Sequence, residues 1–281
     1  MSTSASDEVA FWNGPNGERW VREQAERDAF LAPYGEAALR AAAPAPGESV
    51  LDVGCGCGTT LLALSDAVGP GGRVLGLDVS GPMLARAKEL ARGRSNIAVL
   101  QADATSSPLE RATFDLLFSR FGVMFFDDPV RAFTNLASAL KPSGRLAFAC
   151  WKALGLNAWA RLPVEAAAQV VGRPAPPAPD APGPFSFGAE ERIRAILGRA
   201  GFGPIDVTPV EAPASYPTLE EAAARLARVG PAARLLADRD AATVAKVEAL
   251  LRDALAPFAG AGGVRVPGAG WIVTARAPKA A

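Results

Sequence analysis

From residue 48 onward, short apolar runs alternate with longer stretches in which apolar residues recur every three or four positions. The first pattern predicts buried strands and the second amphipathic helices. Strands are expected at 48–52, 73–78, 96–103, 114–121 and 145–151, and helices near 59–67, 80–92 and 130–140. Repeated alternation with short links predicts an α/β fold, in which helices cover both faces of a mainly parallel sheet.

Apolar residues also recur at helical spacing in the segment before residue 48. Residues 1–43 predict an N-terminal helical cap, interrupted only at Pro33. The cap is dense in aromatic side chains, namely Trp12, Trp20, Phe30 and Tyr34. These rings either fix the cap to the body or close over a ligand, and the pattern leaves both interpretations open.

The C-terminal part departs from simple alternation. We expect helices at 155–171, 188–202, 219–229 and 239–256, a strand at 204–210, a stiff proline-rich connector at 173–184 and a hairpin-like final strand at 263–276. Thr218 and Glu221 have the spacing of a capping box. The domains predicted are the cap (1–43), a ligand-binding core (44–151), and the rest of the sheet with a helical substrate lobe (152–281).

The turn after the first strand carries the clearest chemistry. In the sequence VLDVGCGCGTT, Gly54, Gly56 and Gly58 permit positive φ and expose bare backbone, and the next helix offers unpaired N–H groups. The carboxylate of Asp52 repels a pyrophosphate but accepts hydrogen bonds from an ammonium group. The turn therefore indicates an amino-acid nucleoside as ligand.

The run LDVGCGCG resembles the first motif of class I S-adenosylmethionine-dependent methyltransferases, D-x-G-x-G-x-G after an apolar strand. The resemblance covers roughly 48–151, and a looser match continues to 276. It implies a Rossmann-like, doubly wound sheet of seven mainly parallel strands with a reversed last strand. It also implies S-adenosyl-L-methionine as methyl donor and S-adenosyl-L-homocysteine as product, as in the small-molecule and ubiquinone-biosynthesis-like members.

The resemblance places the donor at the carboxyl ends of the strands, where open parallel sheets bind their ligands. It implies that Asp78 accepts the ribose hydroxyls and that Asp103 and the Ala104 N–H bind the adenine edge; otherwise these acids are capping or turn residues. The full set implied for the donor is Asp52, Gly54, Cys55, Gly56, Gly58, Asp78, Val79, Met83, Asp103, Ala104 and Ser119.

Aromatic and basic residues suit the acceptor side. The resemblance implies that Arg120, Phe121 and Phe125 face the substrate, and we also expect Trp12, Trp20 and Trp151 to line it. Packing between helix and sheet is the competing interpretation for the aromatic members. Their apolar character favours a small organic molecule, such as a natural product or a quinone-like ring.

Composition excludes several other classes. The 29 basic and 29 acidic side chains balance, which indicates neither nucleic acid nor an anionic membrane as a partner, while a homodimer remains possible. The first residues lack a secretory signal, and no apolar run reaches the ~18 residues of a membrane span, so a cytoplasmic protein is expected. The three cysteines lack C-x-x-C spacing, so no disulfide framework or metal site is predicted.

The sequence contains no histidine, so no His–Asp dyad is available as a general base. The catalytic residue is unknown, and an acceptor that ionises easily is expected. We predict a methyltransferase. A dinucleotide oxidoreductase fits poorly because position 59 is threonine. The remaining alternatives are another reaction of the bound donor, such as cyclisation, and a non-catalytic ligand-binding subunit.

Overall fold

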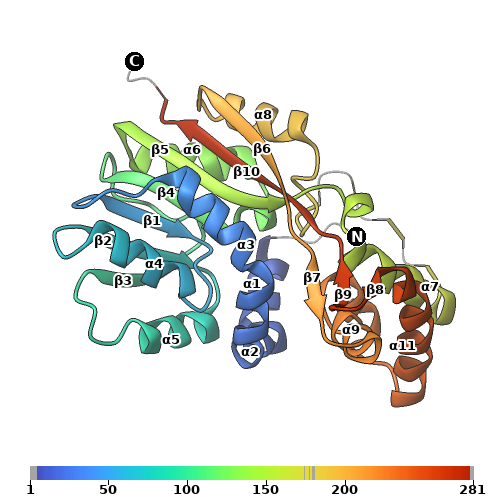
Figure 1. The fold of residues 1–281 in the computed structure, drawn as a ribbon. Helices are drawn as coiled ribbons and strands as arrows, with labels where there is room; N and C mark the ends of the chain where they lie inside the picture. Colours follow the sequence, from blue (N-terminus) through green and yellow to red (C-terminus); the bar gives the residue numbers. More distant parts are fainter. Residues whose placement is uncertain (1–4, 174, 177, 179–180, 279–281) are drawn as a thin grey trace. The chain divides into compact units, whose positions relative to one another are not determined.

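Seven strands form the central sheet in the order β3-β2-β1-β4-β5-β10-β6 (Figure 1). This computed structural model describes residues 5–173, 175–176, 178 and 181–278. The strands are β1 Ser49–Val53, β2 Arg73–Asp78, β3 Ile97–Gln101, β4 Phe114–Arg120, β5 Leu140–Trp151, β6 Ile205–Glu211 and β10 Ala269–Arg276. β1 runs parallel to β2 and β4, and β3 and β5 extend this parallel part on either side. The central strand β1 is buried on both faces, as its apolar run predicts.

The last strand is reversed. The N–H of Ala277, just after β10, donates to the carbonyl of Gly144 near the start of β5 (3.0 Å). The N–H of Gly203, just before β6, donates to the carbonyl of Arg276 at the end of β10 (3.2 Å). The end of β10 thus lies beside the beginnings of both neighbours, which makes it antiparallel to them. The predicted Rossmann-like sheet of seven strands with a reversed last strand is confirmed.

Helices cover both faces of this sheet (Figure 1). On one face lie α3 Gln24–Ala42, α4 Thr59–Val68 and α5 Gly81–Leu90, and on the other α6 Pro129–Ala139 and α8 Glu190–Arg199. The start of α5 is fixed by Ser80, whose hydroxyl accepts from the N–H of Met83 (3.4 Å). The start of α6 is fixed in the same way by Asp128, which accepts from the N–H of Arg131 (3.0 Å).

The N-terminal segment differs from expectation at Pro33. Its helices are α1 Ala5–Asn13, α2 Pro15–Arg22 and α3, and Pro33 lies inside α3 without interrupting it. The predicted break at Pro33 is wrong because local preference yields to packing: Leu31, Tyr34 and Ala38 are buried on this helix, which offsets the lost hydrogen bond. The first break lies instead at Gly14, where Pro15 begins α2.

Contacts divide the described residues into two compact units. The first contains residues 5–150, 181–210 and 271–278, and the second the described part of 151–178 together with 211–270. The second unit consists of α7 Ala158–Val171, α9 Leu219–Leu226, α10 Gly230–Leu236, α11 Ala241–Leu255 and the small sheet β7 (Ala214–Tyr216), β9 (Gly263–Val266) and β8 (Ala259–Gly260). Short 3₁₀ turns lie at Val123–Phe125, Leu154–Leu156 and Ala256–Phe258.

Two predictions in the C-terminal part have clear outcomes. The Thr218 hydroxyl accepts from the N–H of Glu221 (3.1 Å), so the predicted helix cap is confirmed. The predicted final strand forms as β10, but its hairpin-like pairing is wrong, because β9 and β10 belong to different sheets and β9 pairs with β7 and β8. Within the predicted connector, residues 173, 175, 176 and 178 are exposed and irregular, whereas 174, 177, 179 and 180 lie outside the described residues.

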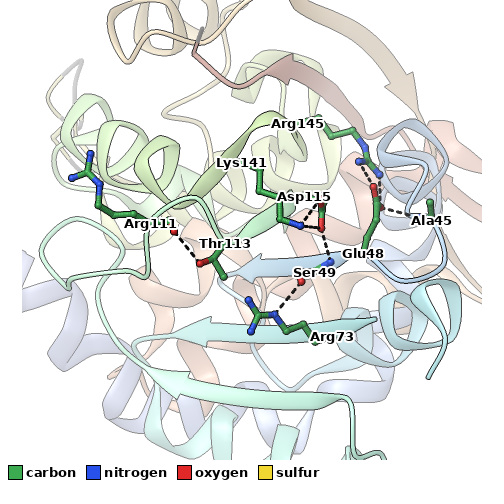
Figure 2. Close-up of polar contacts among 9 residues, drawn as sticks. All are labelled: Ala45, Glu48, Ser49, Arg73, Arg111, Thr113, Asp115, Lys141 and Arg145. Atoms are coloured by element: carbon green, nitrogen blue, oxygen red, sulfur yellow. Dashed lines mark hydrogen bonds and ion pairs between the residues drawn. The ribbon is translucent and has the colours of Figure 1, made fainter. Parts of the chain in front are cut away.

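Two ion pairs lie at the amino ends of the central strands (Figure 2), and Arg145 of one pair also donates hydrogen bonds to the end of α3. Arg145 donates to both carboxylate oxygens of Glu48 (2.7 and 2.8 Å) and to the last carbonyls of the helix, those of Ala42 and Ala43 (2.7 and 2.8 Å). Nearby, Asp115 accepts from Lys141 at both oxygens (2.8 Å each). This network fixes α3 against the sheet at the edge opposite the glycine turn.

No helix in the described ranges is long and apolar enough to cross a membrane.

Candidate functional site

The glycine turn after β1 is held against β2. The N–H groups of Gly54 and Cys55 donate to the carbonyl of Leu77 (2.7 and 3.2 Å). The three glycines of the motif have positive φ, as predicted, at 70° for Gly54, 55° for Gly56 and 91° for Gly58. This conformation explains why the turn needs glycine at each alternate position.

The three glycines differ in what surrounds them. A Cβ atom on Gly54 would lie 2.7 Å from the Cα of Gly122, and one on Gly58 would lie 2.9 Å from the Cβ of Ala87. A Cβ on Gly56 would meet only the sulfur of Met83, at 3.8 Å. Gly54 and Gly58 therefore also serve close packing, whereas Gly56 leaves a stretch of backbone uncovered by neighbouring backbone.

Asp78, the last residue of β2, is 7% exposed and faces this turn. Its Oδ2 accepts from the N–H of Gly56 (2.8 Å), and its Oδ1 accepts from the N–H of Ser80 (2.9 Å). Burial raises the pKa of Asp78, and the N–H donors of Ser80 and Gly56 oppose that effect. The carboxylate thus links the glycine turn to the start of α5.

Asp52 lies under the turn and is fully buried. Its Oδ2 accepts a short hydrogen bond from the hydroxyl of Thr60, while its Oδ1 has no hydrogen-bond partner among the residues that the structure describes. Burial raises the pKa of Asp52 to about 7; the Thr60 hydroxyl and the charge of Arg120 oppose this effect, and the charge of Asp78 adds to it. A buried carboxylate oxygen without a donor is unusual in a folded protein, and it has the capacity to accept a further N–H group.

The loop after β2 is clamped by the N-terminal helices. The Asn13 side chain donates to the carbonyl of Val79 (2.9 Å) and accepts from the N–H of Gly81 (3.0 Å). The hydroxyl of Ser80 donates to the carbonyl of Trp12 (2.7 Å). Val79 is half-buried, and Met83, one turn into α5, is 5% exposed. Sequence patterns give no signal for Asn13, because its partners lie 66 and 68 positions away.

Asp103 organises the turn that follows β3. Its Oδ1 accepts from the N–H of Thr105 (2.8 Å) and its Oδ2 from the hydroxyl of Ser106 (3.0 Å). Ala104 is buried, and its carbonyl accepts from the Asn135 side chain on α6 (2.8 Å). These contacts give Asp103 a structural role in its turn, and its predicted contact with adenine stays a prediction.

Ser119 and Arg120 end β4, next to β1. The Ser119 hydroxyl donates to the carbonyl of Val53 (2.7 Å), which fixes the two strand ends together. The Arg120 guanidinium donates to Asp28 on α3 (2.6 Å), and Asp28 also accepts from the hydroxyl of Thr59 at the start of α4 (2.6 Å). Asp28 is a further residue that the sequence interpretation missed.

The predicted substrate-lining aromatic rings of this unit belong to two separate groups. The Trp12 ring contacts those of Trp20 (5.6 Å between centroids) and Phe125 (5.2 Å), both edge to face. Phe121 packs on the fully buried Tyr34 (5.6 Å) and has a positive φ of 64°, which is unusual for a residue with a side chain. Both groups show the predicted packing between cap and core, and a further contact with substrate stays a prediction.

The remaining predicted residues are buried cysteines and one tryptophan. Cys55 and Cys57 are 3% and 5% exposed, and burial raises the pKa of both thiols, that of Cys57 to about 12. They fill space in the crowded turn. Trp151 belongs to the second unit, where its ring lies 4.9 Å from that of Trp159. Its place in a substrate site stays a prediction. In the described part of the chain, no three His, Cys, Asp or Glu side chains are arranged to hold a metal ion.

Comparison with known proteins places this geometry in a family. Residues 51–148, from the first strand to the fifth, match the family described as "Methyltransferase domain". The chain is 36% identical over 121 residues to aklanonic acid methyltransferase DauC of Streptomyces sp. (strain C5), covering 42% of this chain and 55% of that protein. It is 34% identical over 177 residues to nocamycin O-methyltransferase of Saccharothrix syringae, covering 62% of this chain and 60% of that protein.

The chain thus spans less than two thirds of the length of these two relatives. Among solved structures, the YcgJ protein of Bacillus subtilis superposes with a TM-score of 0.59 at 17% identity, over 88% of this chain and 99% of that one. That likeness extends the shared fold beyond the matched segment. The segment at 51–148, which carries the glycine turn, Asp52 and Asp78, is thus similar to a methyltransferase domain, the family type that its first motif resembles.

Proposed function

We propose that this chain transfers a methyl group from S-adenosylmethionine to a small organic acceptor. The observation that carries the proposal is the edge formed by β1 and β2. There the Asp78 carboxylate links the N–H groups of Gly56 and Ser80, beside backbone that carries no side chain. The family match of residues 51–148 supports the same activity.

The residues at this edge fit the donor group by group. Asp78 would accept the ribose hydroxyls, because a buried carboxylate binds such donors well. The unpartnered oxygen of Asp52 would accept the α-ammonium group, which removes an unsatisfied buried acceptor. Val79 and Met83 would flank the adenine, and Asp103 with Ala104 would lie at its edge. The bare backbone at Gly56 leaves room for the ligand.

When bound, the donor supplies an electrophilic methyl carbon on a sulfonium. The protein's part is to align the acceptor with that carbon and to exclude water. Because the sequence contains no histidine, no imidazole removes a proton from the acceptor. We therefore propose an acceptor that is already nucleophilic or ionises easily: a carboxylate, an acidic phenol, an amine or an activated carbon.

The relatives narrow the acceptor further. Their names give aklanonic acid as the acceptor of one and an oxygen atom as the methylated position in the other. A demethylmenaquinone methyltransferase of Staphylococcus carnosus is 41% identical over 98 residues, which cover 35% of this chain and 41% of that protein. We propose that the acceptor here belongs to the same broad class of natural products and quinone-like rings.

A turnover assay tests the proposed methyl transfer. Purified protein is incubated with S-adenosylmethionine and a panel of aromatic acids, acidic phenols and hydroquinones, and S-adenosylhomocysteine is quantified with the mass of each product. We expect S-adenosylhomocysteine to form together with a product heavier by one methylene unit. As a matched control, Asp66→Asn on the exposed surface of α4 should retain turnover, whereas Asp78→Asn should lose it at low donor concentration. Acceptor conversion without S-adenosylhomocysteine would contradict the proposal and favour a non-methylating reaction.

A further inference from the structure

Arg120 is a largely covered cation at the carboxyl edge of the sheet. Phe118 of β4 lies directly across from Asp52 of β1, so Arg120, two residues further on, points to the same face of the sheet as Asp52. Its side chain is only 13% exposed. Its charge lowers the pKa of Asp52, which shows that the two groups interact electrostatically.

Only part of the hydrogen-bonding capacity of the Arg120 guanidinium is satisfied by described protein groups. Arginine has five N–H donors, and within the described ranges Asp28 is the one group that accepts from Arg120, through a single bond from Nη2. The other oxygen of Asp28 is occupied by the hydroxyl of Thr59. Asp28 therefore fixes the guanidinium from one side and leaves further donors without a described protein partner.

A glycine on α3 leaves space for the Arg120 side chain. Gly35 lies in the interior of α3, where glycine destabilises a helix by about 1 kcal/mol relative to alanine. A Cβ atom at this position would lie 2.9 Å from the Cδ of Arg120. The glycine thus makes room for the arginine stem, and it does so on the same helix that provides Asp28.

We propose that Arg120 binds a carboxylate or another oxyanion of a bound ligand, and that Asp28 is the residue that positions its guanidinium. The inference rests on the proposed function, since it needs a ligand at this edge of the sheet. A planar guanidinium with free N–H donors is suited to such an oxyanion. In a protein without histidine, a fixed cation also favours an acceptor that arrives already ionised.

Two ligands have this chemistry, namely the amino-acid end of the methyl donor and an acidic acceptor. Binding is measured by calorimetry with two matched pairs of probes. The first pair is S-adenosylhomocysteine and 5′-methylthioadenosine, which lacks the amino-acid end. The second is salicylate and its neutral analogue salicylamide, added to protein saturated with S-adenosylhomocysteine. The proteins are the native chain, Arg120→Met, Arg120→Lys, Asp28→Asn and the exposed control Arg131→Met.

We expect Arg120→Met to reduce the preference for the charged member of one pair by at least about tenfold, with Arg120→Lys recovering part of it. A change in the first pair assigns the oxyanion to the donor, and a change in the second assigns it to the acceptor. Asp28→Asn should weaken the same preference less, and Arg131→Met should leave it unchanged.

The inference would be overturned if Arg120→Met lowered the melting temperature but kept the native preference for the charged member of both probe pairs. The proposed function would then remain intact. Native protein that binds no S-adenosylhomocysteine would overturn both.

Discussion

At the scale of single residues, Asp52 dominates the electrostatics of the site. The carboxyl group is fully buried, and its one direct donor in the described chain is the Thr60 hydroxyl. Burial of a carboxylate with one unpartnered oxygen disfavours its charged form. Its raised pKa, about 7, follows from this burial.

This pKa predicts a pH dependence of folding. Because the folded-state pKa of Asp52 lies above its ordinary value of 3.8, its contribution is fully present below that value and is lost as the pH rises towards about 7. Relative to Asp52→Asn, the native chain should lose on the order of 2 kcal/mol of unfolding free energy between pH 5 and 7. Urea unfolding at both pH values measures the difference. Parallel pH profiles for the two proteins would show that Asp52 is not strongly perturbed.

Residue chemistry near the motif was largely predictable from the sequence. The positive φ values of the glycines and the positions of Asp52 and Asp78 at strand ends follow from local patterns. Asn13 and Asp28 were missed because a side chain's partners across the fold leave no local signal: Asp28 meets Arg120 across 92 positions.

At the scale of elements, the N-terminal helices are joined to the core at two places. Asn13 holds the junction of α1 and α2 against the loop after Asp78, and Arg145 holds the end of α3 against the amino ends of the strands. The sequence predicted helices here but placed a break at Pro33, because proline's local preference is visible in a sequence and the burial of α3 is not.

The Asn13 clamp predicts a local effect on the loop after β2. Asn13→Ala removes its hydrogen bonds to Val79 and Gly81 and should destabilise the clamp by about 1–3 kcal/mol. Amide hydrogen exchange at Gly81 should therefore become faster, while exchange in β1 stays slow. Asn16→Ala on α2 is the matched control. Equal exchange at Gly81 in both variants would mean that Asn13 does not fix the loop.

The Arg145 network predicts an effect on global stability (Figure 2). Arg145→Met removes four hydrogen bonds and should lower the unfolding free energy by about 2 kcal/mol. Arg40→Met, whose ion pair with Glu36 is 72% and 68% exposed, should change it by less than about 0.5 kcal/mol. Denaturant unfolding measures both, and equal losses would contradict the account.

The Arg145 network should also change how the free energy of unfolding depends on pH under acidic conditions. Bonds from Arg145 hold the pKa of Glu48 below its ordinary value of 4.5. Its contribution is therefore present above that value and is lost as the pH falls through the folded-state pKa. The stability difference between the native chain and Arg145→Met should shrink on acidification.

At the scale of the whole molecule, alternation of strands and helices predicted the sheet, and the family resemblance predicted its reversed last strand. The small sheet of β7, β9 and β8 was not predicted, because a run such as GVRVPGAGWIVTAR does not reveal that its two strands pair in different sheets. The identity of the acceptor does not follow from the family motif, because one fold serves many different substrates.

The central claim is that the β1–β2 edge binds S-adenosylmethionine through Asp78. Calorimetry with S-adenosylmethionine and NAD, each titrated into the native chain, Asp78→Ala and the surface control Asp66→Ala, tests it most directly. The account predicts binding of S-adenosylmethionine and not of NAD, a loss of affinity of at least about tenfold in Asp78→Ala, and none in Asp66→Ala. Tight binding of NAD with no response to S-adenosylmethionine would contradict it.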